Sequence, residues 1–185
     1  MKCTLIFATE KEACCTIERL EGRKENDHCY AIEDGKLCII GMGTKDLTPF
    51  IPYFESADII LNAGLAGSLS KRLPRESFHR IRTVSYGQTT LQLAEAGAAL
   101  TTRDTPLHSY QEGIELVDME GFHIAALARQ LGKPCALYKI VSDLCDEQSS
   151  EEIRSRLPKL SLALAHYMNE YINEIRKVIP TGSFT

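Results

Sequence analysis

The chain has 185 residues, of which 44% are hydrophobic and 25% are charged. This composition is that of an ordinary globular protein, and it excludes a disordered, collagen-like or low-complexity chain. The 21 basic and 25 acidic residues give a net charge of −4. No cluster of lysines and arginines is dense enough to follow a phosphate backbone, so we expect no nucleic-acid partner.

Other function classes are excluded by the apolar runs and by the cysteine and histidine spacing. No run approaches the roughly 18 apolar residues that a membrane span needs, so we expect no membrane partner. The seven cysteines are odd in number and contain no C-x-x-C pair, which fits neither a disulfide framework nor a zinc site. Free thiols within apolar runs suit a reducing cytoplasm. The five histidines are scattered, and we expect neither a metal nor a cofactor.

Along the chain, apolar runs alternate with helical patterns. Apolar or alternating runs predict strands over 2–8, 29–32, 36–40, 58–62, 78–85, 114–117 and 135–141. Helical patterns predict helices over 10–20, 45–54, about 121–131 and about 151–178. Thr9 is a candidate cap for the first helix. Prolines make the second helix short or broken and predict a break in the last helix at Pro158. The segment 91–102 is ambiguous between helix and strand.

This alternation predicts an α/β fold with three layers, α/β/α. Strands that are apolar throughout are buried on both faces, so we expect a central mixed, mostly parallel sheet covered by helices on both sides. The sequence contains no internal repeat and no linker. A single domain over residues 1–185 is therefore predicted.

Polar residues follow several of the apolar runs, at the edge where such sheets bind ligands. They are Glu10 and Glu12, Asn62-Ala63-Gly64, Asp118 and Glu120, and Ser142-Asp143. Each carboxylate alone has a simpler interpretation as a helix cap or a first-turn acid. The coincidence of three such places at one edge favours a binding site.

Two glycine-rich segments match no nucleotide-binding fingerprint. Gly41-Met42-Gly43 lacks the third glycine of the dinucleotide motif, and 64–68 lacks the lysine of a P-loop. Both segments are interpreted as turns. The second could also let backbone N–H groups approach a ligand closely.

Several segments resemble signatures of the nucleoside phosphorylase/nucleosidase superfamily. They read N-A-G-L-A-G at 62–67, V-D-M-E-G at 117–121 and Y-K-I-V-S-D at 138–143. The superfamily patterns are N-x-G-x-A-G, (V/E)-x-M-E-(A/G) and R-x-(I/V)-S-D. The first strand followed by A-T-E-K-E at 8–12 resembles the hydrolytic branch, the methylthioadenosine/S-adenosylhomocysteine nucleosidases and the futalosine hydrolases.

The resemblance implies a role for each matching residue. Glu12 would activate a water molecule, and Asp143 would protonate or hydrogen-bond N7 of the purine. The implied substrate-binding residues are Gly64, Met119, Glu120, Lys139 and Ser142. Among these, Glu120 would bind the ribose hydroxyls with Met119 packed under the sugar. Ser142 would orient Asp143.

Departures from the family patterns bear on the reaction and the substrate. Phosphorylases hold phosphate with arginines, one of them soon after the first strand, whereas here Glu10 and Glu12 would repel phosphate. Leu65 stands where methylthioadenosine nucleosidases usually have serine and resembles futalosine hydrolases, as does Gly121. Lys139 stands where the family usually has arginine, which keeps the charge and loses the bidentate fork.

The resemblance implies hydrolysis of the N-glycosidic bond of a purine nucleoside, with release of adenine or hypoxanthine. Leu65 favours futalosine or 6-amino-6-deoxyfutalosine, intermediates of menaquinone biosynthesis, as the substrate. A methylthioadenosine/S-adenosylhomocysteine nucleosidase is the close alternative. A non-catalytic nucleoside-binding protein and a structural α/β domain also remain open. Because relatives are usually dimers, we expect a homodimer. We expect it to bind a small purine nucleoside.

Overall fold

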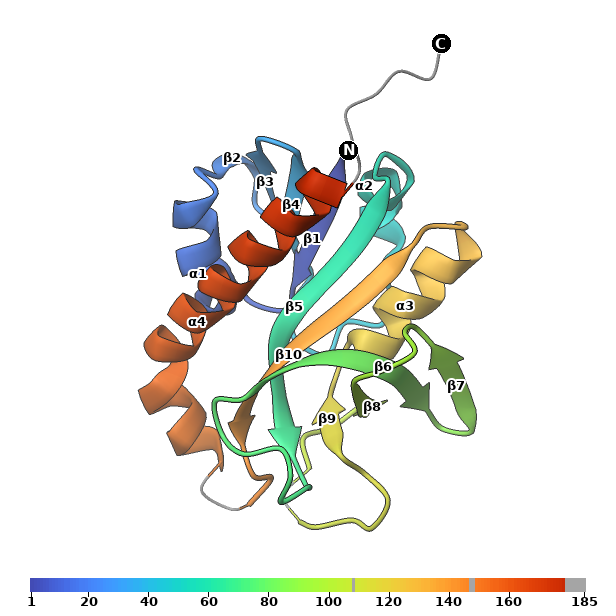
Figure 1. Cartoon of the computed structure of the whole chain (residues 1–185), viewed down its shortest axis with the longest axis vertical. Helices are drawn as coiled ribbons and strands as arrows, with labels where there is room; N and C mark the ends of the chain where they lie inside the picture. The colour runs from blue at the N-terminus through green and yellow to red at the C-terminus, as the bar shows by residue number, and fades with distance from the viewer. Residues whose placement is uncertain (108, 147–148, 179–185) are drawn as a thin grey trace.

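The computed structural model describes residues 1–107, 109–146 and 149–178. Within them the chain forms one sheet and a set of helices that pack against it (Figure 1). The strands are β1 (Cys3–Phe7), β2 (Arg23–Asn26), β3 (Cys29–Ile32), β4 (Gly35–Ile39), β5 (Ile59–Ser68), β6 (Phe78–Tyr86), β7 (Thr89–Gln92), β8 (Ala98–Thr102), β9 (Leu116–Asp118) and β10 (Cys135–Asp143). The helices are α1 (Glu10–Arg19), the short 3₁₀ helix η1 (Thr48–Phe50), α2 (Ile51–Glu55), α3 (Gly121–Gln130) and α4 (Ser149–Val178).

The sheet is parallel at its centre and mixed elsewhere. Strands β4, β1, β5 and β10 run parallel in that order. Strand β10 then pairs with β6, β6 with β8, β8 with β9, and β9 with β5, so that five strands close into a ring. The expected mixed α/β fold is confirmed. A mostly parallel sheet is not, because half of the pairings among the described strands are antiparallel.

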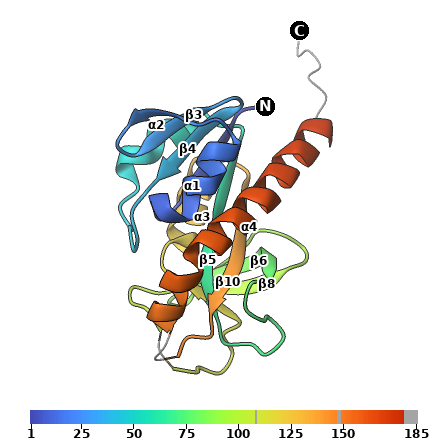
Figure 2. The ribbon, with the colours of Figure 1, turned by 90° about the vertical axis from the view of Figure 1, so that its left-hand side faces the viewer.

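Helices pack on both faces of the parallel centre. Helices α1 and α4 lie side by side on one face, and α2 and α3 lie on the other (Figures 1 and 2). Leu5 and Leu61 are buried under α1 and α4, whereas their neighbours Ile6 and Ile60 are buried under α2 and α3. Successive strand residues point to opposite faces. Neighbouring positions of β1 and of β5 are therefore both apolar.

The prolines have different effects on the second helical segment and on the last helix: the former is short, as expected, and the latter is continuous. Pro49 and Pro52 stand in the first positions of η1 and α2, where a missing N–H costs little, so the expected helix over 45–54 begins later. The expected break at Pro158 is wrong, because α4 continues through it. Leu160 and Leu164 are buried just beyond Pro158 and hold the helix against the core. No helix in the described ranges combines the length and apolar character needed to cross a membrane.

Three further differences concern strands. The glycine-rich segment 63–68, expected as a turn, continues β5 because β10 pairs with it along its length. The ambiguous segment 91–102 contains the end of β7 and all of β8. Strand β2 was not expected, since its four residues are all exposed and carry no apolar signal.

We expect the buried face of α4 to contribute more to stability than its exposed face. Leu164 is fully buried against the sheet, whereas Leu162 is 54% exposed. Leu164→Ala should lower the free energy of unfolding by about 2–5 kcal/mol through lost burial and a cavity. Leu162→Ala is the matched control and should change it by less than about 0.5 kcal/mol. Urea denaturation measures both, and equal losses would contradict this packing.

Candidate active site

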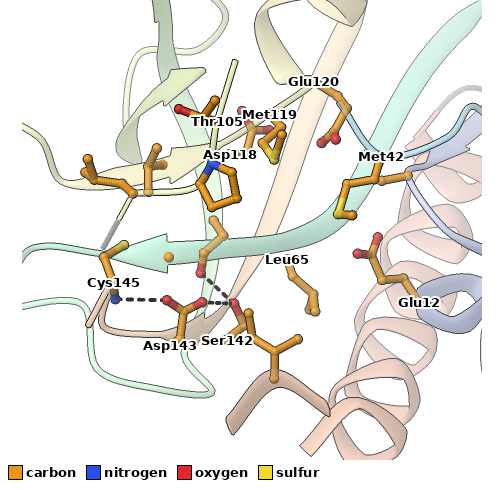
Figure 3. A pocket seen from close by; sticks show the side chains of 17 residues that line it. Glu12, Met42, Leu65, Thr105, Asp118, Met119, Glu120, Ser142, Asp143 and Cys145 are labelled. Carbon is orange, nitrogen blue, oxygen red and sulfur yellow. Dashed lines mark hydrogen bonds between the residues drawn. The ribbon is translucent and has the colours of Figure 1, made fainter. Parts of the chain in front are cut away.

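A cavity of about 290 Å³ lies at the carboxyl ends of β1, β5, β9 and β10. This volume is at the lower end of the range for small-molecule sites, roughly 300–1,000 Å³. Its walls include Glu12, Met119, Glu120, Ser142 and Asp143. Residues from α1, from the segment between β9 and α3, and from the end of β10 thus meet around one space (Figure 3).

Glu12 enters the cavity from the first turn of α1. The helix begins there because the Thr9 hydroxyl accepts a hydrogen bond from the Glu12 N–H at 3.3 Å, which confirms Thr9 as the cap. The Glu12 Oε2 atom is buried, with no hydrogen-bond partner in the described residues. Burial raises the pKa of the Glu12 carboxyl to about 7, although the Lys139 ammonium opposes that rise. Glu12 can therefore exchange a proton near neutral pH.

Glu120 is the N-cap residue of α3, but its side chain does not cap that helix. Instead its Oε1 accepts a hydrogen bond of 2.5 Å from the Gly43 N–H. Gly43 has a φ of +70°, in the left-handed region that glycine adopts without strain. Burial and then the Asp118 charge raise the pKa of the Glu120 carboxyl. The turn after β4 thus orients a carboxyl that points into the cavity (Figure 3).

Asp143 is held at the end of β10 by two polar contacts. Its Oδ1 accepts from the Cys145 N–H at 2.9 Å, and its Oδ2 lies 2.6 Å from the Ser142 hydroxyl. The Ser142 hydroxyl also lies 3.2 Å from the Ala66 carbonyl oxygen. Ser142 can donate to an ionised Asp143, or accept from a protonated Asp143 and donate to Ala66. A Cβ on Gly67 would clash with Cys145 Sγ and lie 3.2 Å from Asp143 Oδ1, so a larger residue there would displace the Cys145 side chain, whose backbone N–H holds this carboxyl.

The cavity has two separated acidic ends. Figure 3 shows Glu12 and Asp143 at different ends, with Leu65 between them. Asp118 and Glu120 also line the cavity, and none of its described lining residues is lysine or arginine. Among the described residues, no group of three or more histidine, cysteine, aspartate or glutamate side chains is arranged to bind a metal ion.

Lys139 and Gly64 lie behind the wall of the cavity and do not line it. The Lys139 Nζ atom is buried and forms an ion pair of 2.9 Å with Asp118 Oδ2. A Cβ on Gly64 would lie 3.5 Å from both Lys139 Nζ and Glu12 Oε2, so these two atoms are at most twice that distance apart. Burial would lower the pKa of the Lys139 ammonium, but Asp118 and Glu120 outweigh it and hold that pKa above its ordinary value.

The structure adds lining residues that the sequence did not single out. Asp118 was noted at the strand edge but given no role, and its pairing with Lys139 could be suspected only from a lysine inside an apolar run. The segment 105–107 lines the cavity without an aromatic residue and belongs to no regular element. Met42 and Cys145 also line it. No periodicity marks any of these positions.

Comparisons with known proteins agree with this geometry. The family described as "Phosphorylase superfamily" matches residues 101–173. No curated protein matches the chain in sequence. The structure is similar to MTAN of Chlamydia trachomatis bound to MTA, with 24% identity and a TM-score of 0.86, covering 94% of this chain and 98% of that one. The same protein bound to adenine is 26% identical, with a TM-score of 0.80 and the same coverage.

A third similar structure is a futalosine hydrolase mutant of Helicobacter pylori. It is 15% identical, with a TM-score of 0.82, and the match covers 94% of this chain and 99% of that one. The resemblance to the nucleoside phosphorylase/nucleosidase superfamily is confirmed. The superfamily signatures at 117–121 and 138–143 fall within the matched range, and both contribute residues to the cavity wall.

The raised pKa of Glu12 has a consequence for stability. Ionising a carboxyl whose pKa is higher in the folded state than in the unfolded state destabilises the fold. Glu12→Gln removes this destabilisation, so above pH 7 the free energy of unfolding of the variant should exceed that of the parent by up to about 3 kcal/mol. The advantage should shrink as pH falls from about 7 toward 4.5 and vanish below that.

Thermal or urea unfolding at several pH values measures this difference. The matched control is Glu18→Gln, which changes an exposed carboxyl on the same helix and should have little effect at any pH. A Glu12→Gln advantage that does not depend on pH would show that the Glu12 carboxyl does not titrate in this range.

Proposed function

We propose that this protein hydrolyses the N-glycosidic bond of a purine nucleoside. The observation that carries the proposal is a cavity lined by the acidic residues Glu12, Asp118, Glu120 and Asp143, with no lysine or arginine among its described lining residues. Such a wall repels phosphate and suits a cationic, oxocarbenium-like sugar. Water is therefore the better nucleophile. The similar structure named as a futalosine hydrolase supports the same reaction class.

The two ends of the cavity divide the chemistry. Glu12 takes a proton from water while the water oxygen attacks C1′ of the ribose. The bond from C1′ to N9 of the purine breaks. Asp143 supplies a proton to N7, so the base leaves neutral. Glu120 binds the ribose hydroxyls and stabilises the cation that forms between the two ends. Ser142, at 2.6 Å, keeps the Asp143 carboxyl oriented.

For the substrate we propose futalosine or 6-amino-6-deoxyfutalosine, which would place the protein in menaquinone biosynthesis. Leu65 supports this choice, because the residue that departs from the methylthioadenosine nucleosidases borders the cavity. Methylthioadenosine and S-adenosylhomocysteine are the alternative substrates, and the Chlamydia trachomatis neighbour bound to MTA supports them. We also propose that a single domain over residues 1–185 acts as a cytoplasmic homodimer.

A base-release assay tests the reaction and the substrate together. Purified protein should release adenine or hypoxanthine from at least one of futalosine, its 6-amino form, methylthioadenosine and S-adenosylhomocysteine, and added phosphate should not change the rate. Strict dependence on phosphate would refute the hydrolase. Nucleoside binding with no release over hours would indicate a binding protein. A melting temperature that no nucleoside raises would indicate a structural domain.

Asp143→Asn tests the proposed acid. The amide keeps the size of the side chain but supplies no proton to N7, so kcat should fall by about 10²–10⁴-fold. Asp27→Asn is the matched control, because Asp27 is 91% exposed and does not line the cavity. Circular dichroism should show that both variants keep the fold. Near-normal turnover of Asp143→Asn would remove its acid role.

A further inference from the structure

Asp118 is a buried carboxylate of the cavity wall to which the proposed reaction gives no role. Three donors surround it. Its Oδ2 lies 2.9 Å from Lys139 Nζ and 3.0 Å from the Gly121 N–H, and its Oδ1 accepts from the Thr102 hydroxyl at 2.6 Å. A carboxylate with this many partners is held in one position.

The surrounding backbone fixes Asp118 more firmly still. The Thr102 hydroxyl itself accepts a hydrogen bond of 2.9 Å from the Phe122 N–H in the first turn of α3. A Cβ on Gly121 would lie 2.7 Å from Asp118 Oδ2, so only glycine permits this approach. The carboxylate thus sits at the N-terminus of a helix, where negative charge is favoured.

The buried Lys139 side chain also has a fixed position, near both Asp118 and Glu12. It lies in the middle of β10, directly beside Gly64 of β5, and its side chain is only 2% exposed. Because Gly64 has no side chain, the ammonium and the Glu12 carboxyl can both approach that backbone. One buried cation therefore stands near the carboxyls of Asp118, Glu12 and Glu120.

Few other charged groups reach the Glu12 carboxyl. Lys139 faces it from β10, and Glu120 faces it from the start of α3, with Asp118 behind the lysine. From β5, Gly64 adjoins the carboxyl and Leu65 lines the same cavity. From α4, the Ser161 hydroxyl bonds the Glu12 backbone carbonyl at 2.9 Å and leaves the carboxyl alone. On α1 itself, Glu10 is engaged by the Tyr30 hydroxyl.

We propose that Asp118 is a positioning residue. It anchors the Lys139 ammonium and offsets the attraction between that ammonium and the Glu12 carboxylate. This role rests on the proposed function, in which Glu12 is the base. An ammonium free to pair with Glu12 would hold that carboxyl permanently ionised, and a carboxylate so stabilised is a weak base. With the ammonium anchored by Asp118, Glu12 can accept a proton from water at neutral pH. The arrangement works with lysine, whose single charged nitrogen is engaged by one Asp118 oxygen.

The titration of Glu12 can be read directly by NMR on protein carrying ¹³C-labelled carboxyl groups, with Glu12→Gln and Asp118→Asn assigning the two signals. In the unmodified protein the Glu12 signal should titrate near pH 7. The titration itself is measured on the unmodified protein, and the two variants serve only to assign the signals. A Glu12 signal that shows no titration near pH 7 would overturn the proposal.

Asp118→Asn supplies the second test. It removes an anion and releases the Lys139 ammonium toward Glu12, so the Glu12 midpoint should fall by about one pH unit. Asp27→Asn is the matched control: it makes the same substitution at an exposed aspartate outside the cavity and should leave the midpoint in place. An unchanged or raised midpoint in Asp118→Asn, or equal shifts in both variants, would contradict the anchoring role.

Kinetics separate this proposal from the proposed function. If the protein is a nucleosidase, the acid limb of the kcat/KM profile should move down in pH by the same amount as the NMR midpoint in Asp118→Asn. If the protein cleaves no nucleoside but Asp118→Asn lowers the NMR midpoint, the anchored ion pair is supported and the proposed function is refuted. An acid limb that stays in place while the NMR midpoint moves would show that Glu12 is not the base, and the positioning role would fall.

Discussion

A single buried ammonium constrains the architecture of this site. Lys139 is almost completely enclosed, and an unpaired charge there would destabilise the fold by several kcal/mol. The ion pair with Asp118 therefore requires that β10 and β9 bring their residues to one place. Two glycines make the approach possible, Gly64 beside the ammonium and Gly121 beside the carboxylate. The same cluster places Glu12 and Glu120 where their carboxyls are buried and protonate more readily than usual.

Much of the fold follows from local sequence signals. Leu5 and Ile6, like Ile60 and Leu61, are apolar neighbours because helices cover both faces of the central strands. The signals that failed were local ones overruled by distant partners. The glycines of 63–68 indicate a turn by themselves, yet pairing with β10 extends them into a strand. Pro158 indicates a break, yet packing of α4 on the sheet keeps the helix continuous.

The candidate site likewise contains residues that the sequence predicts and contacts that only the fold determines. Glu12, Glu120 and Asp143 could be predicted because they follow apolar runs at one edge of the sheet and match signatures of a known superfamily. That they meet at one cavity is a property of the fold. The ion pair between Asp118 and Lys139 could not be predicted, because the sequence places Asp118 at the binding edge of the sheet but does not show which side chain it contacts. The wall formed by 105–107 belongs to an irregular segment that no pattern marks.

The proposed reaction requires one orientation of the nucleoside within the cavity, with the purine at Asp143, the ribose at Glu120 and the reactive C1′ turned toward Glu12. A crystal structure of the Glu12→Gln variant soaked with methylthioadenosine, whose purine and ribose every proposed substrate shares, tests this orientation most directly. We expect the ribose hydroxyls within hydrogen-bond distance of Glu120 and N7 of the purine beside Asp143. A nucleoside bound with its base at residue 12, or bound outside the cavity, would contradict the assignment of the two acidic ends.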